Sequence, residues 1–477
     1  MRLLQTCQKG GATMPTITPF RVQVDVQAWT PQGKHYHTDL MGSLKQISTS
    51  KTTNEPYGTF TLTFTSQERG HGTWADKLPY RTYIEIRAGA NTVGEPPILM
   101  RGFVSTGTQS LTMPQSPQGP SRQVTVTGKD FGVILADWQI LYLWGIDPMA
   151  TYLNANTSGG DALGHTLGVN AQSTSPTTII QSFFDKLVAT AVKGLQKDIS
   201  AAIPTMAAKI TLPSAYEVNF LNLQPWQGSY ANFLDYFASP PWGEDFVYDA
   251  ESGPEFILRQ TPYKNFATGD YPLPFGTVGD NNGFFPDVTL NAGDIPGHNL
   301  TINGAEQVYT YFLTVPDMAS SQAQSNALWY FVSSGGTQIT TQSSAQHPGS
   351  NPYYDAARAN VWGIRPLQVT TPWISVITQT TGPLPAQMNT WLVNVFQDND
   401  LFSSGTITCH GHQDLKIGRY LVLNPGLTTV FSQPYEAYIE QVQHSIDIYS
   451  DTATWTTNLG VVRGRVRTAL TPYQGGS

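Results

Sequence analysis

Four runs near the C-terminus decide the fold of this sequence: GTITCHGH (405–412), YLVL (420–423), YEAYIEQVQHSI (435–446) and TATWTTNLGVVRG (452–464). Within each run β-branched or aromatic residues alternate with other residues, and Gly, Pro, Asn or Asp separate the runs. Because successive side chains on a strand point to opposite faces, such runs are typical of strands with one buried face. The sequence therefore predicts four strands of an antiparallel meander, and nothing in them matches a catalytic motif.

A second set of alternating runs lies near the N-terminus: FRVQVDV (20–26), TFTLTFT (59–65), YIEIR (83–87), ILMRGFV (98–104) and RQVTVTG (122–128). Turn residues separate them at intervals of a dozen or so residues, as in a barrel or sandwich. Strand order matches the C-terminal set when 58–63 is aligned with 405–410, 83–86 with 420–423, 102–104 with 440–442, and 124–128 with 455–459. We therefore predict a duplicated β domain with loops of different length.

Between the two sets the periodicity becomes helical. Ser175 and Pro176 are suited to begin a helix, and apolar residues follow at helical spacing from Ile180 to Leu195, a pattern typical of a core-facing helix. A shorter helix is predicted at 230–237, with strands at 244–249 and 255–260, and further helices at 355–361 and 388–396. The predicted fold class is mainly β with α+β insertions, built on two antiparallel β-barrel domains.

The composition is poor in charge. Of 477 residues only 13% are charged and 40% are hydrophobic, so the chain has few charges with which to cover its surface. Either other subunits cover part of the apolar surface, or a large all-β protein presents neutral polar residues to water. The net charge of −8 argues against a surface that holds nucleic acid tightly, and is compatible with one that lets DNA pass.

Two cysteines, Cys7 and Cys409, argue against a disulfide framework and for folding in a reducing compartment. The N-terminus lacks the apolar core of a signal peptide, and no window has the apolar length of a membrane span, so no membrane insertion is expected. Met14 is an alternative start to Met1, which would make the first residues a poorly ordered lead.

Several residues are candidates for metal-binding or catalytic sites. His35 with His37, and His410 with His412, each place two imidazoles on one strand face, but zinc needs three or four converging ligands and Cys409 points to the other face. The carboxylate pairs Glu244/Asp245 and Asp398/Asp400 match glycosidase chemistry in residue type only.

The basic cluster Arg463, Arg465 and Arg467 is expected to be a solvated tail, with a phosphate or an acidic subunit as the alternative partner. No nucleophile elbow, phosphate loop or zinc-protease motif occurs. We therefore predict no catalytic, cofactor-binding or metal-binding residue, and no cofactor.

Three stretches carry a resemblance to a known family. VTVTGKDF (124–131) resembles the strand that closes the first barrel of bacteriophage tail baseplate hub proteins, of the late control protein D type. WGIRPL (362–367) is similar to a segment before their last barrel, with Trp362 where tyrosine is commoner. EAYIEQVQHSI (436–446), followed by 455–464, resembles their ending, in which a Val-x-His strand precedes a threonine-rich strand and an Arg-Gly.

The resemblance implies two tail-tube-like barrels in each chain and three chains in a ring. Such a homotrimer has six similar barrels around the DNA channel, joins the sixfold tail tube to the threefold central spike, and contacts other baseplate proteins. It would be made in the host bacterial cytoplasm and function in the virion, at the baseplate of a contractile tail. DNA would pass through without specific binding, beside a channel wall expected to be negative.

On this basis the chain divides into seven segments: a lead (1–16), a first tube-like barrel (17–130), an α+β inserted domain (131–262), a connection with strands joining the second barrel (263–313), an inserted excursion (314–387), the second tube-like barrel (388–467) and a tail (468–477).

Two other functions remain open from the sequence. One is a distal tail or tube-end protein of another phage tail or injection machine. The other is an enzyme or binding protein for glycans or cell wall, whose aromatic loops with Trp226, Trp242 and Trp329 would stack on sugars. That function requires two converging carboxylates in an aromatic cleft.

Overall fold

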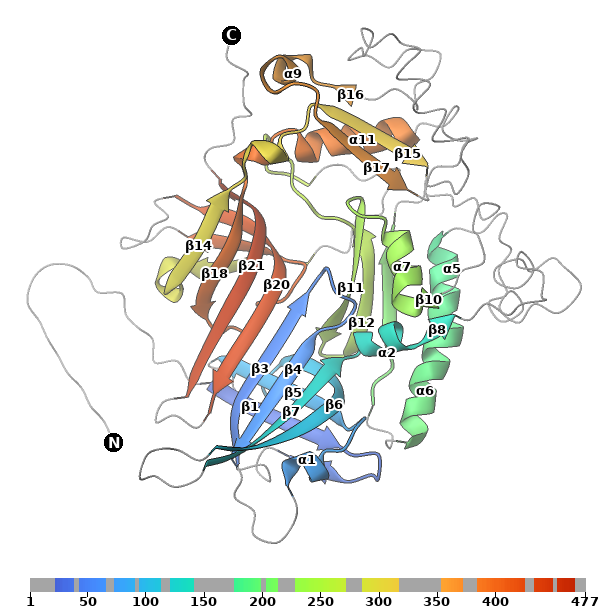
Figure 1. The fold of residues 1–477 in the computed structure, drawn as a ribbon, viewed down its shortest axis with the longest axis vertical. Helices are drawn as coiled ribbons and strands as arrows, with labels where there is room; N and C mark the ends of the chain where they lie inside the picture. The colour runs from blue at the N-terminus through green and yellow to red at the C-terminus, as the bar shows by residue number, and fades with distance from the viewer. Residues whose placement is uncertain are drawn as a thin grey trace, which may run out of the picture.

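The computed structural model describes residues 22–37, 43–65, 73–90, 94–112, 121–140, 176–198, 203–212, 228–271, 285–316, 353–371, 384–424, 433–448 and 453–467. Strands predominate and most of their pairings are antiparallel. Helices lie along one side and at both ends of the molecule (Figure 1). The predicted fold class, mainly β with α+β insertions, is confirmed.

The first repeat contains β1 (Val22–Trp29), β2 (His35–Tyr36), β3 (Leu44–Thr52), β4 (Thr59–Thr65), α1 (Trp74–Lys77), β5 (Tyr83–Ala90), β6 (Ile98–Thr112) and β7 (Ser121–Asp130). Its sheet curls around a core to which every long strand contributes, including Val26, Ile47, Leu62, Ile84 and Val126. In β4 the alternation is direct: Phe60, Leu62 and Phe64 are buried, whereas Thr59 is exposed. Period-two patterning thus produces a sheet with one dry face.

The second repeat contains β13 (Val288–Asn291), η5 (Ala292–Asp294), β14 (Gly297–Ile302), η7 (Asn399–Leu401), β18 (Ser403–His410), β19 (Tyr420–Asn424), β20 (Tyr435–Asp447) and β21 (Thr454–Val466). The predicted simple meander is wrong in one respect. β18 pairs with β21 and not with β19, giving the order β18-β21-β20-β19 of a Greek key. The reason is the connection after His410. Its residues Leu415 and Ile417 are buried in the core, and the chain reaches the far side of β20 before β19 begins.

A third core lies between and beside the repeats. It is built by α2 (Gly132–Asp137), α5 (Pro176–Phe183), a π-helical turn (Phe184–Val188), α6 (Ala189–Asp198), α7 (Tyr230–Ala238), β11 (Gly243–Ala250), β12 (Gly253–Gln260), β15 (Tyr311–Pro316), β17 (Pro366–Thr371) and α11 (Leu384–Phe396). The helices predicted near 176–195, 230–237 and 388–396 are all present.

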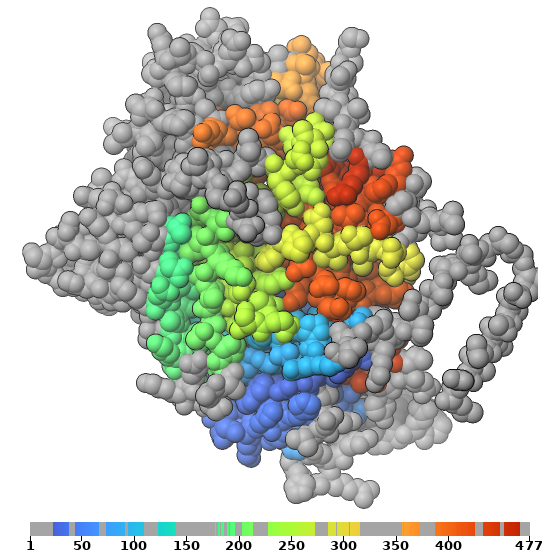
Figure 2. Space-filling view, turned by 180° about the vertical axis from the view of Figure 1, so that it is seen from behind, coloured from blue at the N-terminus to red at the C-terminus, as the bar shows by residue number. Residues whose placement is uncertain are grey.

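Smaller elements complete this region: β8 (Gln139–Ile140), β9 (Ala207–Thr211), β10 (Gly228–Ser229), η6 (Ala305–Gln307), β16 (Tyr353–Tyr354) and α9 (Ala356–Trp362). Seen from behind, the second repeat lies directly beside the first, and the green inserted segment runs along one side (Figure 2). Segments inserted after β7 and after β15 therefore share one apolar core with Trp242 and Trp391 at its centre.

Candidate assembly interface

The two repeats form one continuous sheet. Its strand order is β14-β18-β21-β20-β3-β4-β7-β6-β5-β1-β2, so that β20 of the second repeat pairs directly with β3 of the first (Figure 1). The pairing is antiparallel and extends from Gln441 opposite Thr52 to Asp447 opposite Gln46. Hydrogen bonds continue at both ends, from Thr53 N to Glu440 O and from Ile448 N to Lys45 O, each 2.9 Å. The junction is thus a full strand-to-strand ladder.

The repeats share the same pairing scheme. β3·β4, β4·β7, β7·β6 and β6·β5 in the first correspond to β14·β18, β18·β21, β21·β20 and β20·β19 in the second, all antiparallel. Tyr83 lies opposite Phe103, as Tyr420 lies opposite Tyr438. The duplication predicted from the sequence is therefore present in the topology. Three of the sequence alignments need correction. Phe103 corresponds to Tyr438, and the facing residues of the neighbouring strands make Gly128 correspond to Val461 and Phe60 to Gly405.

On the part of the sheet formed by β18, β21, β3, β4, β7 and residues 441–447 and 106–112, the face opposite the core is almost free of charge. Farther along the same face, β1, β5 and β6 carry Asp25, Glu85, Arg87 and Arg101. In the uncharged part, the side chains alternate with the core residues of each strand and include Gln46, Ser48, Ser50, Thr59, Thr61, Thr106, Thr125, Thr127, Thr406, Thr408, Gln441, Gln443, Ser445, Thr456 and Asn458. Adjacent strands are linked on this face by Thr106 Oγ1 to Thr127 Oγ1 at 2.7 Å and by Thr408 Oγ1, which donates to Asn458 Oδ1 at 2.8 Å. Such a surface carries no array of cations for phosphate groups.

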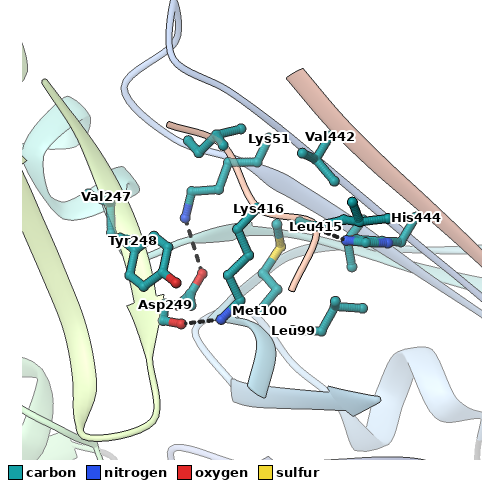
Figure 3. Close-up of a pocket in the computed structure, with 12 residues that line it drawn as sticks. Lys51, Leu99, Met100, Val247, Tyr248, Asp249, Leu415, Lys416, Val442 and His444 are labelled. Carbon is teal, nitrogen blue, oxygen red and sulfur yellow. Dashed lines mark hydrogen bonds and ion pairs between the residues drawn. The ribbon is translucent and has the colours of Figure 1, made fainter. Parts of the chain in front are cut away.

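A buried ion cluster lies behind the junction. Lys51 of β3 contacts Asp130 Oδ2 of β7 at 2.6 Å. It also contacts Asp249 Oδ2 of β11 at 3.1 Å (Figure 3). Burial by itself lowers the pKa of Lys51, but the two carboxylates outweigh burial and hold this pKa above its usual value. Lys416 Nζ donates to Asp249 O at 2.6 Å, and burial lowers the pKa of Lys416 to about 8. The cluster connects both repeats to the inserted domain.

His444 lies in the same region of β20. Its Nε2–H donates to Leu415 O at 3.2 Å, and its Nδ1 lies 2.8 Å from Thr457 Oγ1 and accepts from Trp455 Nε1 at 3.2 Å. Burial lowers the pKa of His444 to about 3, so the imidazole is neutral at physiological pH. The cavity beside it, lined in part by Lys51, Met100 and Leu415, has a volume of about 30 Å³. That volume is on the scale of a single water molecule.

A second ion cluster fastens β20 to the inserted domain. Arg259 of β12 donates to Glu244 Oε1 at 2.7 Å and to Gly418 O at 2.5 Å, and Tyr438 of β20 donates to Glu244 Oε2 at 2.5 Å. Glu244 therefore has the role of a structural counter-ion.

Asp245 lies next to this cluster, in a cavity of about 250 Å³ that Asp235 and Glu440 also line. Burial first, then the charges of Asp235 and Glu244, raise the pKa of Asp245 well above its usual value. Burial likewise raises the pKa of Asp235 and of Glu440. The predicted pair Glu244/Asp245 thus lines one cavity, in which Tyr263 is the single aromatic residue among the described lining residues.

The other predicted carboxylate pair is structural. Asp398 and Asp400 both accept from the guanidinium of Arg358, each at 3.0 Å, and so attach α9 to the turn before β18. Burial raises the pKa of Asp398, against the opposing effect of Arg358.

The expectation of a solvated tail is wrong for Arg463 and Arg465, which are buried, whereas Arg467 is partly exposed and contacts Glu436 Oε2 at 2.9 Å. Arg465 is buried against Glu436, with Nε 2.7 Å from Oε1, and it donates to Asn265 O and Phe266 O at 2.8 Å. Arg463 donates to Val395 O at 2.6 Å, and burial lowers the pKa of Arg463 to about 10. Glu436, placed opposite Arg465 in the β20·β21 ladder, is the physical reason that the side chain of Arg465 turns inward.

The histidine pairs do not converge with further ligands. His37 contacts Asp25 at 3.1 Å, His35 stacks on Trp29, and His412 contacts Asp414 at 3.5 Å. Cys409 is buried and its thiol donates to Thr457 O at 3.5 Å. Within the described ranges no group of three or more His, Cys, Asp or Glu side chains is arranged to hold a metal ion.

The aromatic residues suggested for sugar stacking are not available for it in the part that the structure covers. Trp242 is fully buried and packs on Trp391 at 5.4 Å between ring centroids. Trp226 and Trp329 lie outside the described residues, as does Cys7. In the helices that the structure describes, none has the length and apolar character to cross a membrane.

Sequence reasoning missed the residues that make the junction. β3 was not predicted, because LKQISTSKT (44–52) contains only Leu44 and Ile47 as large apolar residues. Alternating hydroxyl residues at Ser48 and Ser50 were the available signal, and they repeat the threonine alternation of β4.

No protein-family model and no curated protein matches the chain. Its fold is similar to the solved 43 kDa tail protein of prophage MuSo2 from Shewanella oneidensis, at 13% identity and a TM-score of 0.46 over 92% of this chain and 98% of that one. A tail protein from Neisseria meningitidis MC58 aligns at 11% identity and 0.47 over 92% and 96%. Prophage tail protein gp18 from Listeria monocytogenes EGD-e aligns at 9% and 0.41 over 91% and 94%. All three are tail proteins.

Proposed function

We propose that this protein is a structural baseplate hub of a contractile phage tail, and that three copies form a ring that joins the tail tube to the central spike. The observation that carries this proposal is the repeated domain within one continuous sheet. Two equivalent domains in each chain, placed side by side by a strand ladder, give a threefold ring sixfold pseudo-symmetry. In this proposal residues 17–130 form one tube-like domain, and 388–467 with strands of 263–313 form the other.

The uncharged face of the sheet is the proposed channel wall. The family resemblance implies a negative wall, but this face presents threonine, serine, glutamine and asparagine, with Asp447 and Lys129 at strand ends. Without clustered cations there is no release of counter-ions on contact with DNA, so the genome would pass without being held. The inserted helical domain would lie outside the ring, toward the spike and other baseplate proteins.

The test is the mass of the full chain in solution, by light scattering, with negative-stain images of the same sample. The expected result is a threefold ring with six similar lobes around a pore. A chain that stays monomeric, both alone and with a spike protein added, would overturn the proposal. A ring of another symmetry would favour the alternative, a distal tail or tube-end protein of a different tail or injection machine.

The acidic cavity favours a second candidate, action on glycans or cell wall, because Asp235, Asp245 and Glu440 line one space with raised pKa values. Hydrolysis of peptidoglycan by the wild type that is lost in Asp245→Asn would support it. No hydrolysis by the wild type would leave the cavity as a structural feature.

A further inference from the structure

The repeat makes it possible to compare equivalent strand edges, starting from β6 and β20. Both strands carry a β-bulge at the same point relative to their neighbours, between Val104 and Thr106 in β6 and between Ile439 and Gln441 in β20. Residues 106–112 of β6 therefore correspond to 441–447 of β20. In β20 this half is the one paired with β3.

In β6 the same half has an open edge. β5 pairs only as far as Phe103, and the last hydrogen bonds on that side run from Val104 N to Thr82 O and from Arg81 N to Val104 O, each 2.9 Å. From Thr106 to Thr112 the strand pairs with β7 on one side, and none of the described strands lies on its other side. Thr106, Gly107 and Thr108 are exposed.

β14 is the counterpart of β3. In the first repeat, the residues that lie opposite one another on adjacent strands are Val104 of β6, Gly128 of β7, Phe60 of β4 and Thr49 of β3. In the second repeat, the equivalent residues are Ile439 of β20, Val461 of β21, Gly405 of β18 and Leu300 of β14. Leu300 of β14 therefore corresponds to Thr49 of β3, and Ile302 to Lys51. β14 ends the sheet: β18 pairs with one edge, and no described strand pairs with the other.

The exposure of Ile302 marks this edge. Ile302 is 70% exposed, the highest value among the large apolar side chains of the described residues, whereas the side chain of Lys51 in the covered junction is 13% exposed. Large apolar side chains at an open strand edge favour a partner that covers them.

We propose that residues 106–112 of β6 in one chain pair antiparallel with β14 of a second copy, in the register of the β20·β3 junction. His444 faces Thr49 in that junction. The equivalent register places Thr108 opposite Thr301 and Gly107 opposite Ile302. This inference deepens the proposed ring, since it assigns the surfaces through which neighbouring copies meet.

Neither segment has the features that keep open edges apart. Natural edge strands are usually blocked by Lys, other charges or Pro. The segments TGTQSLT (106–112) and GHNLTI (297–302) contain no Lys, Arg, Asp, Glu or Pro. Their solvent-face residues, such as Thr108, Asn299 and Thr301, match the neutral Ser50 and Gln443 of the internal junction in chemical type.

The partner has to be another molecule, because β18, β21, β20, β3, β4 and β7 separate β14 from β6 in the sheet order. Each copy presents one edge of each kind, so the contact is head-to-tail, and such contacts close into a ring when the rotation between copies permits.

A disulfide across the pair Thr108→Cys and Thr301→Cys tests the register. In the internal junction Thr53–Glu440 and Ile448–Lys45 are hydrogen-bonded pairs, so the alternating pattern makes Ser50–Gln443 a non-hydrogen-bonded pair. The corresponding Thr108–Thr301 pair is then about 4.5 Å apart between Cα atoms, within reach of a disulfide. The background is Cys7→Ser; Cys409 is buried and its pKa is raised to about 12, so it stays unreactive.

The matched control is Thr108→Cys with Asn299→Cys, which is on the same face but displaced by about 7 Å along the strand. After mild oxidation of the full chain, the first variant is expected to shift from monomer to covalent dimer and trimer on a non-reducing gel, and the control to remain monomeric. A trimeric mass without cross-links would overturn this pairing and leave the proposed ring standing. Cross-linked products larger than a trimer would support the pairing and contradict the threefold ring. Absence of both association and cross-links would overturn both.

Discussion

The two repeats have the same strand pairings but differ in what covers their outer strand. In the first, β3 is covered by β20 of the same chain, and Lys51 reaches inward to two carboxylates. In the second, the equivalent β14 has no described strand on its far edge, and Ile302 takes the place of Lys51 at 70% exposure. They also differ at the other edge, where β1 is antiparallel to β5 but β13 is parallel to β19. The edge of β3 is thus paired within the chain, whereas the equivalent edge of β14 has no described strand beside it. Such a pair of edges is expected of a subunit that binds a further copy of itself through the unpaired edge.

The largest loss of stability at the junction between β20 and β3 is expected from a substitution of Lys51. Lys51→Met leaves Asp130 and Asp249 buried without their ammonium partner, and we expect the free energy of unfolding to fall by about 3–5 kcal/mol. Urea denaturation of the wild type and the variant measures the difference. Lys45→Met, at an exposed position of the same strand, is the control and is expected to change the free energy of unfolding little. Equal effects of the two changes would contradict the role of the cluster.

Acid should weaken the same junction through His444. The pKa of His444 is near 6.5 in the unfolded chain and about 3 in the folded protein, so between these pH values protons bind preferentially to the unfolded state. With respect to this group, the stability of the protein is therefore complete above pH 6.5 and falls as the pH drops toward 3. The loss from this group is at most roughly 5 kcal/mol. His444→Asn should therefore lose less stability than the wild type between pH 6.5 and 3, measured by denaturation at each pH. His410→Asn, exposed on β18, should follow the wild type.

The inserted domain offers a smaller change of opposite sign at Asp245. An acid whose folded-state pKa is raised favours folding below its unfolded pKa, and this contribution is lost as the pH rises through the folded pKa. Asp245→Asn is therefore expected to stabilise the protein by about 1 kcal/mol near neutral pH and to have no such benefit near pH 3. Thermal melts at both pH values test this. Glu244→Gln, which weakens the partner of Arg259, should destabilise instead.

The open edge can be tested with almost no effect on the fold. Ile302→Thr removes an exposed apolar side chain, so the stability of the single chain should change by no more than about 0.5 kcal/mol. Self-association should weaken, which light scattering over a concentration series would detect. Val361→Thr removes a side chain that is 56% exposed on α9, away from the edge, and should leave association unchanged. If both variants associate like the wild type, the edge has no such role.

Three features can be predicted from the order of the residues alone: the strands whose alternation is strong, the helices with an apolar stripe, and the duplication. Phe60, Leu62 and Phe64 on one face of β4 need no tertiary information, because period-two burial is a local property. The same holds for the helix from Pro176, where spacing alone identifies the buried face.

The pairing of β3 with β20 and the burial of the charged residues depend on the tertiary structure. β3 has few large apolar residues, so its pairing with β20 depends on a ladder between segments far apart in the chain, which leaves no local periodicity to detect. The inward direction of Arg463 and Arg465 depends on Glu436 and on the carbonyls of Val395 and Asn265. Whether a charge is solvated or buried is set by partners that the fold supplies, and their proximity cannot be derived from the spacing of the charges themselves.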